Sequence, residues 1–262
     1  MSDGLPVPVL MYHDIADDPD VVPAGHRPYV VSSDAFRAHL RLLAILGMGG
    51  ARLDALLDPG EVTAGGRRSC VLTFDDGHES NFTRALPALL EAGCKATFFV
   101  TVGWIGQAPY MSWDQIKSLV AAGMEVGSHS MTHRPPSTLT RTELRAEMAD
   151  SRKSLEDRIG LPVVTASSPT GFFNPEMIPV AREAGYRALC YGRIGIWKHQ
   201  RDSFRIPRLP VKHRTTSLDL RALALGNRFV LARLRAQQLA RNSLKATLGV
   251  DGYLRLRRRL LR

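Results

Sequence analysis

The stretch VLTFDDGHES, Val71 to Ser80, runs from four residues that favour burial straight into two adjacent carboxylates, Asp75 and Asp76, a glycine and a histidine. The apolar half is typical of a strand inside a hydrophobic core. A carboxylate is costly to bury unless it is paired or hydrogen-bonded. Two carboxylates at the end of such a strand therefore indicate that the fold supplies them with partners.

Strand and helix patterns alternate along the rest of the chain. Four helix starts are predicted, at Ser32 or Ser33, at the capping boxes Ser112/Gln115 and Thr140/Glu143, and at Asn174–Pro175. A further helix is predicted through residues 86–90, ending at Gly93. Seven strands are predicted, at residues 7–13, 70–74, 94–102, 124–128, 163–167, 188–191 and 204–211. Strands separated mostly by helices predict a parallel, barrel-like α/β sheet with its site at the carboxyl ends of the strands.

The basic residues are concentrated in the last part of the chain. The 262 residues carry a formal net charge of +10, from 35 Lys and Arg against 25 Asp and Glu. Residues 218–262 hold 11 of these basic residues and two of the acids, which leaves 24 bases and 23 acids elsewhere. We therefore expect one large domain over residues 1–217, followed by a basic helical C-terminal extension over residues 218–262.

The cysteines and the N-terminus indicate a reducing compartment. Cys70, Cys94 and Cys190 have no CxxC spacing and cannot pair evenly, so buried free thiols are expected. The first residues, MSDGLPVPVLMYHDI, have no basic segment followed by a long apolar one, and no apolar run approaches the length of a membrane span. These features favour a cytoplasmic protein.

Several polar side chains follow predicted strands and are expected to meet at one edge of the sheet. Asp75 and Asp76 follow the second strand, His129 and His133 in SHSMTH follow the fourth, and His13 ends the first. His, His and Asp form a competent ligand set for zinc or a similar divalent ion, and a water bound there becomes more acidic. The second aspartate is then available as a general base. Taken alone, the pair Asp75–Asp76 could be an ordinary acidic turn, and His129 and His133 could be surface histidines.

These motifs resemble those of a known family. TFDDG (Thr73–Gly77) and HSMTH (His129–His133) resemble the first two motifs of the polysaccharide deacetylases, the NodB-homology group. The likeness extends over roughly residues 6–211, through LMYHDI, FRAHLRLLAILG, KATFFVTVGWIG and MSWDQIKSLVAAGMEVGSHSMTH. It implies a distorted (β/α)7-type barrel and metal-dependent removal of an N-acetyl group, or less often an O-acetyl group, from a sugar.

The resemblance also implies roles for individual residues. By position, Asp75 is the catalytic base, while Asp76, His129 and His133 bind the metal, expected to be Zn²⁺ with Co²⁺ or Ni²⁺ as alternatives. MYH, ending at His13, resembles the subgroup with circularly permuted motifs, as in poly-N-acetylglucosamine deacetylases, so His13 is expected to protonate the leaving amine. His213 in LPVKHRTT is the other candidate acid, and a solvated loop residue is the alternative for it.

The third motif departs from the family pattern. The sequence SSPTGFFN has Ser167 and Ser168 where the family often carries an arginine or an aromatic residue. If that arginine is missing, Asp75 needs another partner, and Arg208 in the last strand is the candidate by position. The predicted substrate contacts are two aromatic side chains, two residues near a backbone amide that would hold an oxyanion, and this arginine: Trp104, Phe172, Thr170, Gly171 and Arg208.

The end of the chain, GYLRLRRRLLR, predicts a basic amphipathic helix. Apolar positions share one side and arginines the other: Tyr253, Leu256 and Leu260 against Arg255, Arg258, Arg259 and Arg262. Peripheral contact with an anionic membrane is the hypothesis, and a solvated charged tail is the alternative. Nucleic acid is not expected, because the tail has one aromatic residue and the rest of the chain is nearly neutral.

The sequence therefore predicts an enzyme that removes an acetyl group from an N-acetylated sugar in a polysaccharide, oligosaccharide or lipid-linked glycan. Amide hydrolysis on a non-sugar substrate is the alternative within the enzyme class. The alternative to an enzyme is a catalytically silent carbohydrate-binding protein of the same fold. The altered third motif supports this alternative.

Overall fold

The computed structural model describes residues 6–58, 68–171, 174–198 and 202–260, apart from a few side chains in the C-terminal helix. A closed barrel of seven parallel strands forms its centre. Around the ring the strands are β2 (Val9–Tyr12), β12 (Ile206–Pro210), β10 (Ala188–Ile194), β9 (Thr165–Ser167), β8 (Glu125–Ser128), β7 (Thr97–Val100) and β6 (Arg68–Phe74). Parallel pairing of β2 with β6, from Val9↔Val71 to Tyr12↔Phe74, closes the ring. The seven predicted strands and the barrel are confirmed.

Five shorter strands lie outside this ring and were not predicted. β5 (Met48–Ala51) pairs in parallel with the first half of β6. The pair β3 (Asp14–Ala16) and β4 (Val30–Ser32) is parallel, and the pair β1 (Pro6–Val7) and β11 (Trp197–Lys198) is antiparallel. These segments are two to four residues long, which is too short for a periodic pattern to develop.

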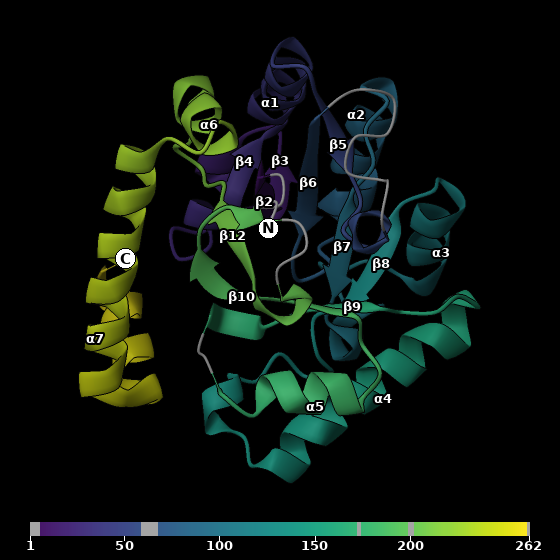
Figure 1. Cartoon of the computed structure of the whole chain (residues 1–262), viewed down its shortest axis with the longest axis vertical. Helices are drawn as coiled ribbons and strands as arrows, with labels where there is room; N and C mark the ends of the chain where they lie inside the picture. The colour runs from purple at the N-terminus through teal and green to yellow at the C-terminus, as the bar shows by residue number, and fades with distance from the viewer. Residues whose placement is uncertain (1–5, 59–67, 172–173, 199–201, 261–262) are drawn as a thin grey trace, which may run out of the picture.

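Five helices connect successive parts of the barrel and cover its outside (Figure 1). They are α1 (Ser33–Ile45), α2 (Leu86–Glu91), α3 (Trp113–Ala121), α4 (Arg141–Ile159) and α5 (Met177–Glu183). Ser32 caps α1, and both predicted capping boxes are present, at the starts of α3 and α4. α5 begins two residues later than Pro175, although the Asn174 side chain still accepts a hydrogen bond from the Glu176 N–H.

The strands present two faces, and their alternation decides what enters the barrel. On β6, Cys70, Leu72 and Phe74 belong to the large apolar cluster between strands and helices, whereas Val71 belongs to a second cluster with Phe99, Ala188 and Ile206. This second cluster fills the barrel interior. Gly127 on β8 makes room for it, because a Cβ there would lie 2.6 Å from the Phe99 ring.

Two C-terminal helices complete the chain. α6 (Ser217–Ala224) packs on α1 and contributes Leu220, Leu223 and Ala224 to the large apolar cluster, so the packing of the main body extends past residue 217. α7 (Arg228–Leu260) stands along the β10 and β12 side of the barrel (Figure 1). Its helical path is interrupted at Gly249, where φ is 66° and ψ is 177°. A backbone with positive φ favours glycine, which explains the residue at this bend.

The predictions about cysteines and membrane spans can also be compared with the structure. Cys70, Cys94 and Cys190 are buried free thiols, as predicted. Among the described residues, no helix combines the length and the apolar character that crossing a membrane requires.

Candidate active site

Asp75 lies at the carboxyl end of β6 and points into the barrel. The interior face of β6 carries Val71 and then Thr73. Because side chains alternate between the two faces of a strand, the next residue on this face is Asp75. The residue is 3% exposed. β6 therefore delivers this carboxylate to the floor of a site at the end of the barrel.

Arg208 on β12 is the partner of Asp75. Its two terminal nitrogens each donate to a different carboxylate oxygen, with both distances 2.6 Å. The same guanidinium also donates to Ser167 Oγ at 2.6 Å and to Thr73 Oγ1 at 3.2 Å. Bidentate pairing of this kind fixes the orientation of a carboxylate as well as its charge. The position of Arg208 in the last strand was the basis for expecting this pair, and the structure contains it.

The pairing explains why Ser167 in the third motif is small. Ser167 ends β9 and its hydroxyl accepts from Arg208, which crosses the barrel interior from β12. The Arg208 guanidinium lies 5.6 Å above the Phe99 ring, so it covers the apolar filling of the barrel below. A larger side chain at Ser167 would occupy the space that this guanidinium takes. In this chain the cation beside Asp75 comes from β12.

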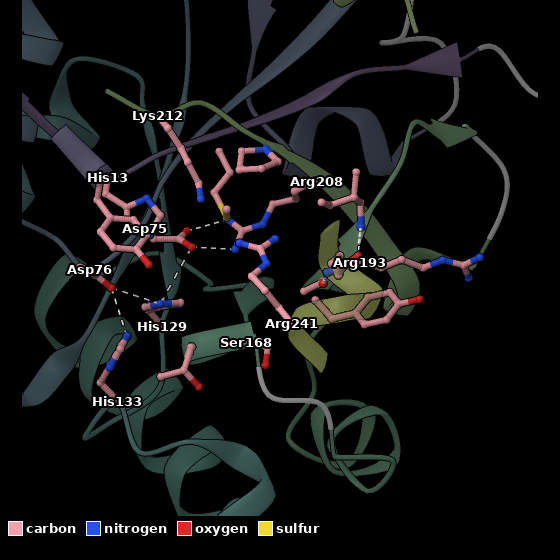
Figure 2. A pocket seen from close by; sticks show the side chains of 18 of the residues that line it. His13, Asp75, Asp76, His129, His133, Ser168, Arg193, Arg208, Lys212 and Arg241 are labelled. Carbon is pink, nitrogen blue, oxygen red and sulfur yellow. Dashed lines mark hydrogen bonds and ion pairs between the residues drawn. The ribbon is translucent and has the colours of Figure 1, made fainter. Parts of the chain in front are cut away.

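Asp76, His129 and His133 come together beside this pair (Figure 2). One carboxylate oxygen of Asp76 lies 3.3 Å from His129 Nε2 and 3.2 Å from His133 Nε2. Asp76 has a φ of 75°, which turns its side chain away from the direction taken by Asp75. The adjacent aspartates therefore face different partners, one an arginine and the other two imidazoles.

The donor set fits a divalent metal ion. His129 Nδ1 lies 3.0 Å from the carbonyl oxygen of Ser167, and because that oxygen can only accept, Nδ1 carries the hydrogen. In the neutral imidazole, Nε2 then carries the lone pair, on the side of the ring that faces Asp76. A histidine whose second nitrogen donates to a backbone carbonyl is the usual arrangement in metal sites. Asp76, His129 and His133 would hold the ion.

A network of hydrogen bonds positions the loop that carries the two histidines. Ser130 and His133 both have positive φ, 68° and 59°, and the Ser130 hydroxyl accepts from the His133 N–H at 3.0 Å. Glu147 on α4 accepts from the N–H groups of Met131 and Thr132 at 2.9 and 2.8 Å, and from the Thr132 hydroxyl. A backbone that is strained at single residues persists only where surrounding contacts hold it. Sequence reasoning did not identify Glu147, because it lies in a helix with no pattern linking it to the motif.

The charges of the site follow from these contacts. Burial opposes the ionised form of Asp75, but Arg208 and His129 outweigh it and lower the pKa of that carboxyl. Burial likewise opposes ionisation of Asp76, whose pKa is held well below its usual range by hydrogen bonds to His129 and His133. Both aspartates are therefore carboxylates at neutral pH. The same carboxylates raise the pKa of His129 against the effect of its burial.

The two candidate acids are placed differently. His13 lines the cavity above Asp75, its ring lies 4.9 Å from that of Tyr29, and its buried Nδ1 has no hydrogen-bond partner among the described residues. Burial lowers the pKa of His13 although Asp76, Asp75 and Asp14 act in the opposite direction. His213 lies outside the residues that line the cavity, with Nε2 3.7 Å from Asp20.

The other predicted substrate contacts are only partly at the cavity. Thr170 lines it, with a φ of 59°. Trp104 does not: its ring stacks on Tyr110 and lies against His133, both at 4.6 Å between centroids, so it supports a metal ligand instead of facing the cavity. Gly171 ends the same short helical turn as Thr170 and is not among the lining residues. Phe172 lies outside the described residues. The sugar contacts of all four stay predictions.

A cavity of about 350 Å³ opens above these residues. Its barrel side is formed by the aspartates, the histidines and Arg208, and its other side by the ends of β10 and α7. Residues on that second side escaped the sequence reasoning, because they lie in a surface helix and at the end of β10, and their proximity to the motifs depends on tertiary structure: Tyr191, Arg193, Gln238, Arg241, Asn242, Lys245 and Tyr253.

The fold and the site together define a class. A closed parallel barrel carries, at the carboxyl ends of its strands, an Asp/His/His ligand set for a divalent metal beside a second carboxylate held by arginine. Residues 63–189 match the family model described as polysaccharide deacetylase. This central part of the chain belongs to the polysaccharide deacetylase family.

Individual relatives agree with this assignment. A Bacillus subtilis protein named as a polysaccharide deacetylase, YxkH, is 31% identical over 188 residues, which cover 69% of this chain and 62% of the relative. The peptidoglycan-N-acetylglucosamine deacetylase of Bacillus cereus is 29% identical over 121 residues, 46% of this chain and 54% of the relative. The chain thus spans between half and two thirds of the length of these relatives.

The fold matches solved structures over most of the chain. The Streptococcus pyogenes deacetylase PplD, solved in complex with acetate, superposes with a TM-score of 0.75 at 20% identity, covering 84% of this chain and 99% of that one. At this identity the similarity concerns the fold, and it confirms the barrel.

Proposed function

We propose that this protein is a metal-dependent deacetylase that hydrolyses the N-acetyl group of an amino sugar in a polysaccharide, oligosaccharide or lipid-linked glycan. The observation that carries the proposal is the pairing of two adjacent aspartates with different partners. Asp75 is held by Arg208 as an oriented carboxylate, and Asp76 faces His129 and His133. Family membership supports the same reaction, since relatives are named as deacetylases of peptidoglycan and of chitooligosaccharides.

Asp75 is suited to act as the base. A divalent ion held by Asp76, His129 and His133 would bind a water and lower its pKa toward about 7. Asp75 Oδ2 lies 4.0 Å from His129 Nε2, so this carboxylate is next to the ligand set and can accept a proton from a water in the cavity. Arg208 keeps the carboxylate ionised and fixes its direction before substrate arrives.

His13 is our candidate for the acid that protonates the leaving amine. It is the candidate that lines the cavity, and its lowered pKa leaves the imidazole neutral at neutral pH until a proton arrives. Asp75 and His13 are both lining residues, which allows the proton taken from water to be delivered to the amine within the cavity. The Thr170 backbone N–H, at a residue with positive φ beside the cavity, is the proposed donor to the developing oxyanion.

Zn²⁺ is the proposed native ion, with Co²⁺ and Ni²⁺ as alternatives. Two imidazoles and one carboxylate with an open position suit zinc in hydrolytic sites. Equilibrium competition with a chromogenic chelator would rank the three ions. Tighter binding of Mg²⁺ or Mn²⁺ than of Zn²⁺ would contradict this part of the proposal.

The test of the function is acetate release from a panel of N-acetylated sugars by zinc- or cobalt-loaded protein. The Asp75→Asn variant keeps the shape of the base and removes its basicity, so acetate release should fall by about 10² to 10⁴-fold. The control is Asp150→Asn, which changes an exposed aspartate on α4. A panel with no activity and protein that binds no metal would overturn the proposal.

A cytoplasmic location and peripheral membrane contact are further proposals. Tyr253, one of the apolar positions of the predicted membrane face, lines the active-site cavity, while Leu256 is half-buried. The side chains of Leu260, Arg258 and Arg259 and all of Arg262 lie outside the described residues. Unchanged co-sedimentation with anionic vesicles after deletion of residues 250–262 would end the membrane hypothesis.

A further inference from the structure

The lining of the cavity around the Asp75–Arg208 pair is strongly basic. Four cationic side chains line the cavity, from the end of β10, the loop after β12 and α7: Arg193, Lys212, Arg241 and Lys245. We refer to these four residues as the cationic wall. Figure 2 shows Lys212 and Arg241 extending toward the region of the Asp75–Arg208 pair from different sides of the cavity, while Arg193 extends away from it.

The carboxylates of the cavity do not balance this wall. Asp75 and Asp76 are the two carboxylates among the described residues that line the cavity, against five cations including Arg208. Arg208 is paired with Asp75, and Asp76 faces the two histidines. Within the described part of the chain, neither Arg193 nor Arg241 has a hydrogen bond or ion pair with a carboxylate. A bound divalent ion would add further positive charge.

α7 is held in place by the same face that carries the cations. Arg235 donates to the Ile194 carbonyl at 3.2 Å, and Gln238 accepts from the Ile194 N–H at 3.0 Å and donates to the Gly192 carbonyl. Arg241 and Lys245 follow Gln238 by three and seven positions, so all four share one side of the helix. Lys245 donates to the Thr170 carbonyl at 3.4 Å, at the edge of the cavity. The docking of α7 therefore fixes Arg241 and Lys245 at the cavity.

The size of the cavity and the kind of cation limit the occupant. Cations of one cavity repel one another, and this cost is relieved when an anion binds between them. A nucleic acid backbone needs a basic surface along its length, whereas this charge faces a cavity of about 350 Å³. Arginine binds phosphate oxygens through its planar fork of donors, and several cations on separate elements suit more than one negative charge.

We propose that the cationic wall is a phosphate subsite, so that the substrate is an N-acetylated amino sugar joined to one or more phosphate groups. This inference rests on the proposed deacetylase function and specifies its substrate class. The acetyl group would lie at Asp75 and the metal ligands, with the phosphate against Arg241 and Lys212. A nucleotide-linked sugar, a lipid diphosphate-linked sugar and a free sugar phosphate share this chemistry.

The experiment compares kcat/KM for acetate release from matched neutral and phosphorylated sugars. The neutral substrates are methyl N-acetylglucosaminide and N,N′-diacetylchitobiose. The phosphorylated ones are N-acetylglucosamine 1-phosphate, UDP-N-acetylglucosamine and a short-chain prenyl diphosphate-linked N-acetylglucosamine. The metal-loaded protein should prefer the phosphorylated set by about tenfold or more, and Arg241→Gln should reduce that ratio about tenfold. The ranking within the phosphorylated set identifies the group beyond the phosphate.

The control is Arg233→Gln, an exposed arginine on the same helix that does not line the cavity, which should leave the ratio unchanged. Equal kcat/KM for neutral and phosphorylated sugars, or a preference that Arg241→Gln does not alter, would overturn the subsite while leaving the deacetylase function intact. A stronger preference for a sugar carrying a carboxylate than for any phosphorylated sugar would overturn the choice of phosphate.

A second readout does not depend on catalysis. Inorganic pyrophosphate is titrated calorimetrically into the metal-loaded protein and into its Arg241→Gln and Arg233→Gln variants. Because all three hold the same metal, binding that weakens about tenfold in Arg241→Gln alone supports the subsite. If no sugar releases acetate, this result would still support the subsite, so the subsite and the deacetylase function are tested separately. Binding that is the same in all three proteins would reject the subsite.

Discussion

Asp75 and Glu125 are two buried carboxylates inside one barrel, and they are treated in opposite ways. Asp75, at the carboxyl end, is paired with Arg208, and its pKa is lowered. Glu125, at the start of β8, accepts hydrogen bonds from Thr97, Thr165 and the Asp54 N–H, and none of the described residues pairs a cation with it. Burial raises its pKa to about 7. At the carboxyl ends of the strands the barrel stabilises the ionised form of Asp75, where the proposed chemistry needs a base. At the opposite end it accommodates Glu125, a carboxyl group that can be neutral.

The largest expected effect comes from removing the cation beside Asp75. Arg208→Ala leaves a buried carboxylate without its partner, which should lower the free energy of unfolding by about 3–5 kcal/mol. Acetate release should also fall, because Asp75 loses its orientation. Urea denaturation at pH 7 measures the first effect.

The control for Arg208→Ala is Arg205→Ala, which removes an arginine from an exposed ion pair with Asp202 and should cost about 0–1 kcal/mol. The double variant Arg208→Ala with Asp75→Asn should recover part of the lost stability, since the buried charge is gone. Equal stability of Arg208→Ala and Arg205→Ala would contradict the description of Arg208 as the partner of a buried charge.

The two candidate acids give the next prediction. His13→Ala should reduce acetate release by about 10² to 10⁴-fold, because the cavity loses the imidazole expected to protonate the leaving amine. His213→Ala should leave the rate within about twofold, because His213 lies outside the cavity. Steady-state rates and metal content are measured for both variants. The reverse ranking would assign the acid to His213.

Glu125 predicts a specific dependence of stability on pH. Its pKa is raised from 4.5 to about 7, so the folded state favours the protonated form. The contribution of Glu125 to the free energy of unfolding is therefore most favourable below about pH 4.5. It is lost as the pH rises through 7, by about 3 kcal/mol in total. Glu125→Gln should therefore gain stability relative to the natural protein over this window.

Urea denaturation at half-unit steps from pH 4.5 to 8 measures this difference. Glu91→Gln, an exposed surface substitution, is the control and should run parallel to the natural protein. A difference between Glu125→Gln and the natural protein that is constant with pH would mean that Glu125 does not titrate in this range.

A third buried carboxylate sharpens the comparison with a smaller effect. Glu147 binds the backbone of the loop that carries His133, without touching the cavity. Glu147→Gln should weaken zinc binding by about 10 to 100-fold, because the loop loses part of its support. Competition with a chromogenic chelator measures this, with Glu156→Gln on the same helix as the control. Unchanged zinc affinity would show that the remaining hydrogen bonds hold the loop.

Much of the barrel could be predicted because its signals are local. The strand ending at Phe74, the capping boxes at Ser112 and Thr140, and the two motifs at Asp75 and His129 are each short segments whose pattern follows from backbone periodicity or from hydrogen bonds within one turn. The motifs at Asp75 and His129 both follow strands, and the carboxyl ends of parallel strands lie at the same end of a barrel. Predicting that the two motifs meet therefore required only that the strands be parallel.

The amino-acid sequence by itself determined the seven strands, the aspartate and histidine motifs and the basic character of the C-terminal extension. The tertiary structure decided which of these residues meet. Arg208 reaches an aspartate 133 positions away, and Gln238 holds the end of β10 from 44 positions away, with no local pattern linking either pair. Such contacts depend on barrel closure and on the docking of α7, because only a folded chain brings distant side chains within hydrogen-bonding distance.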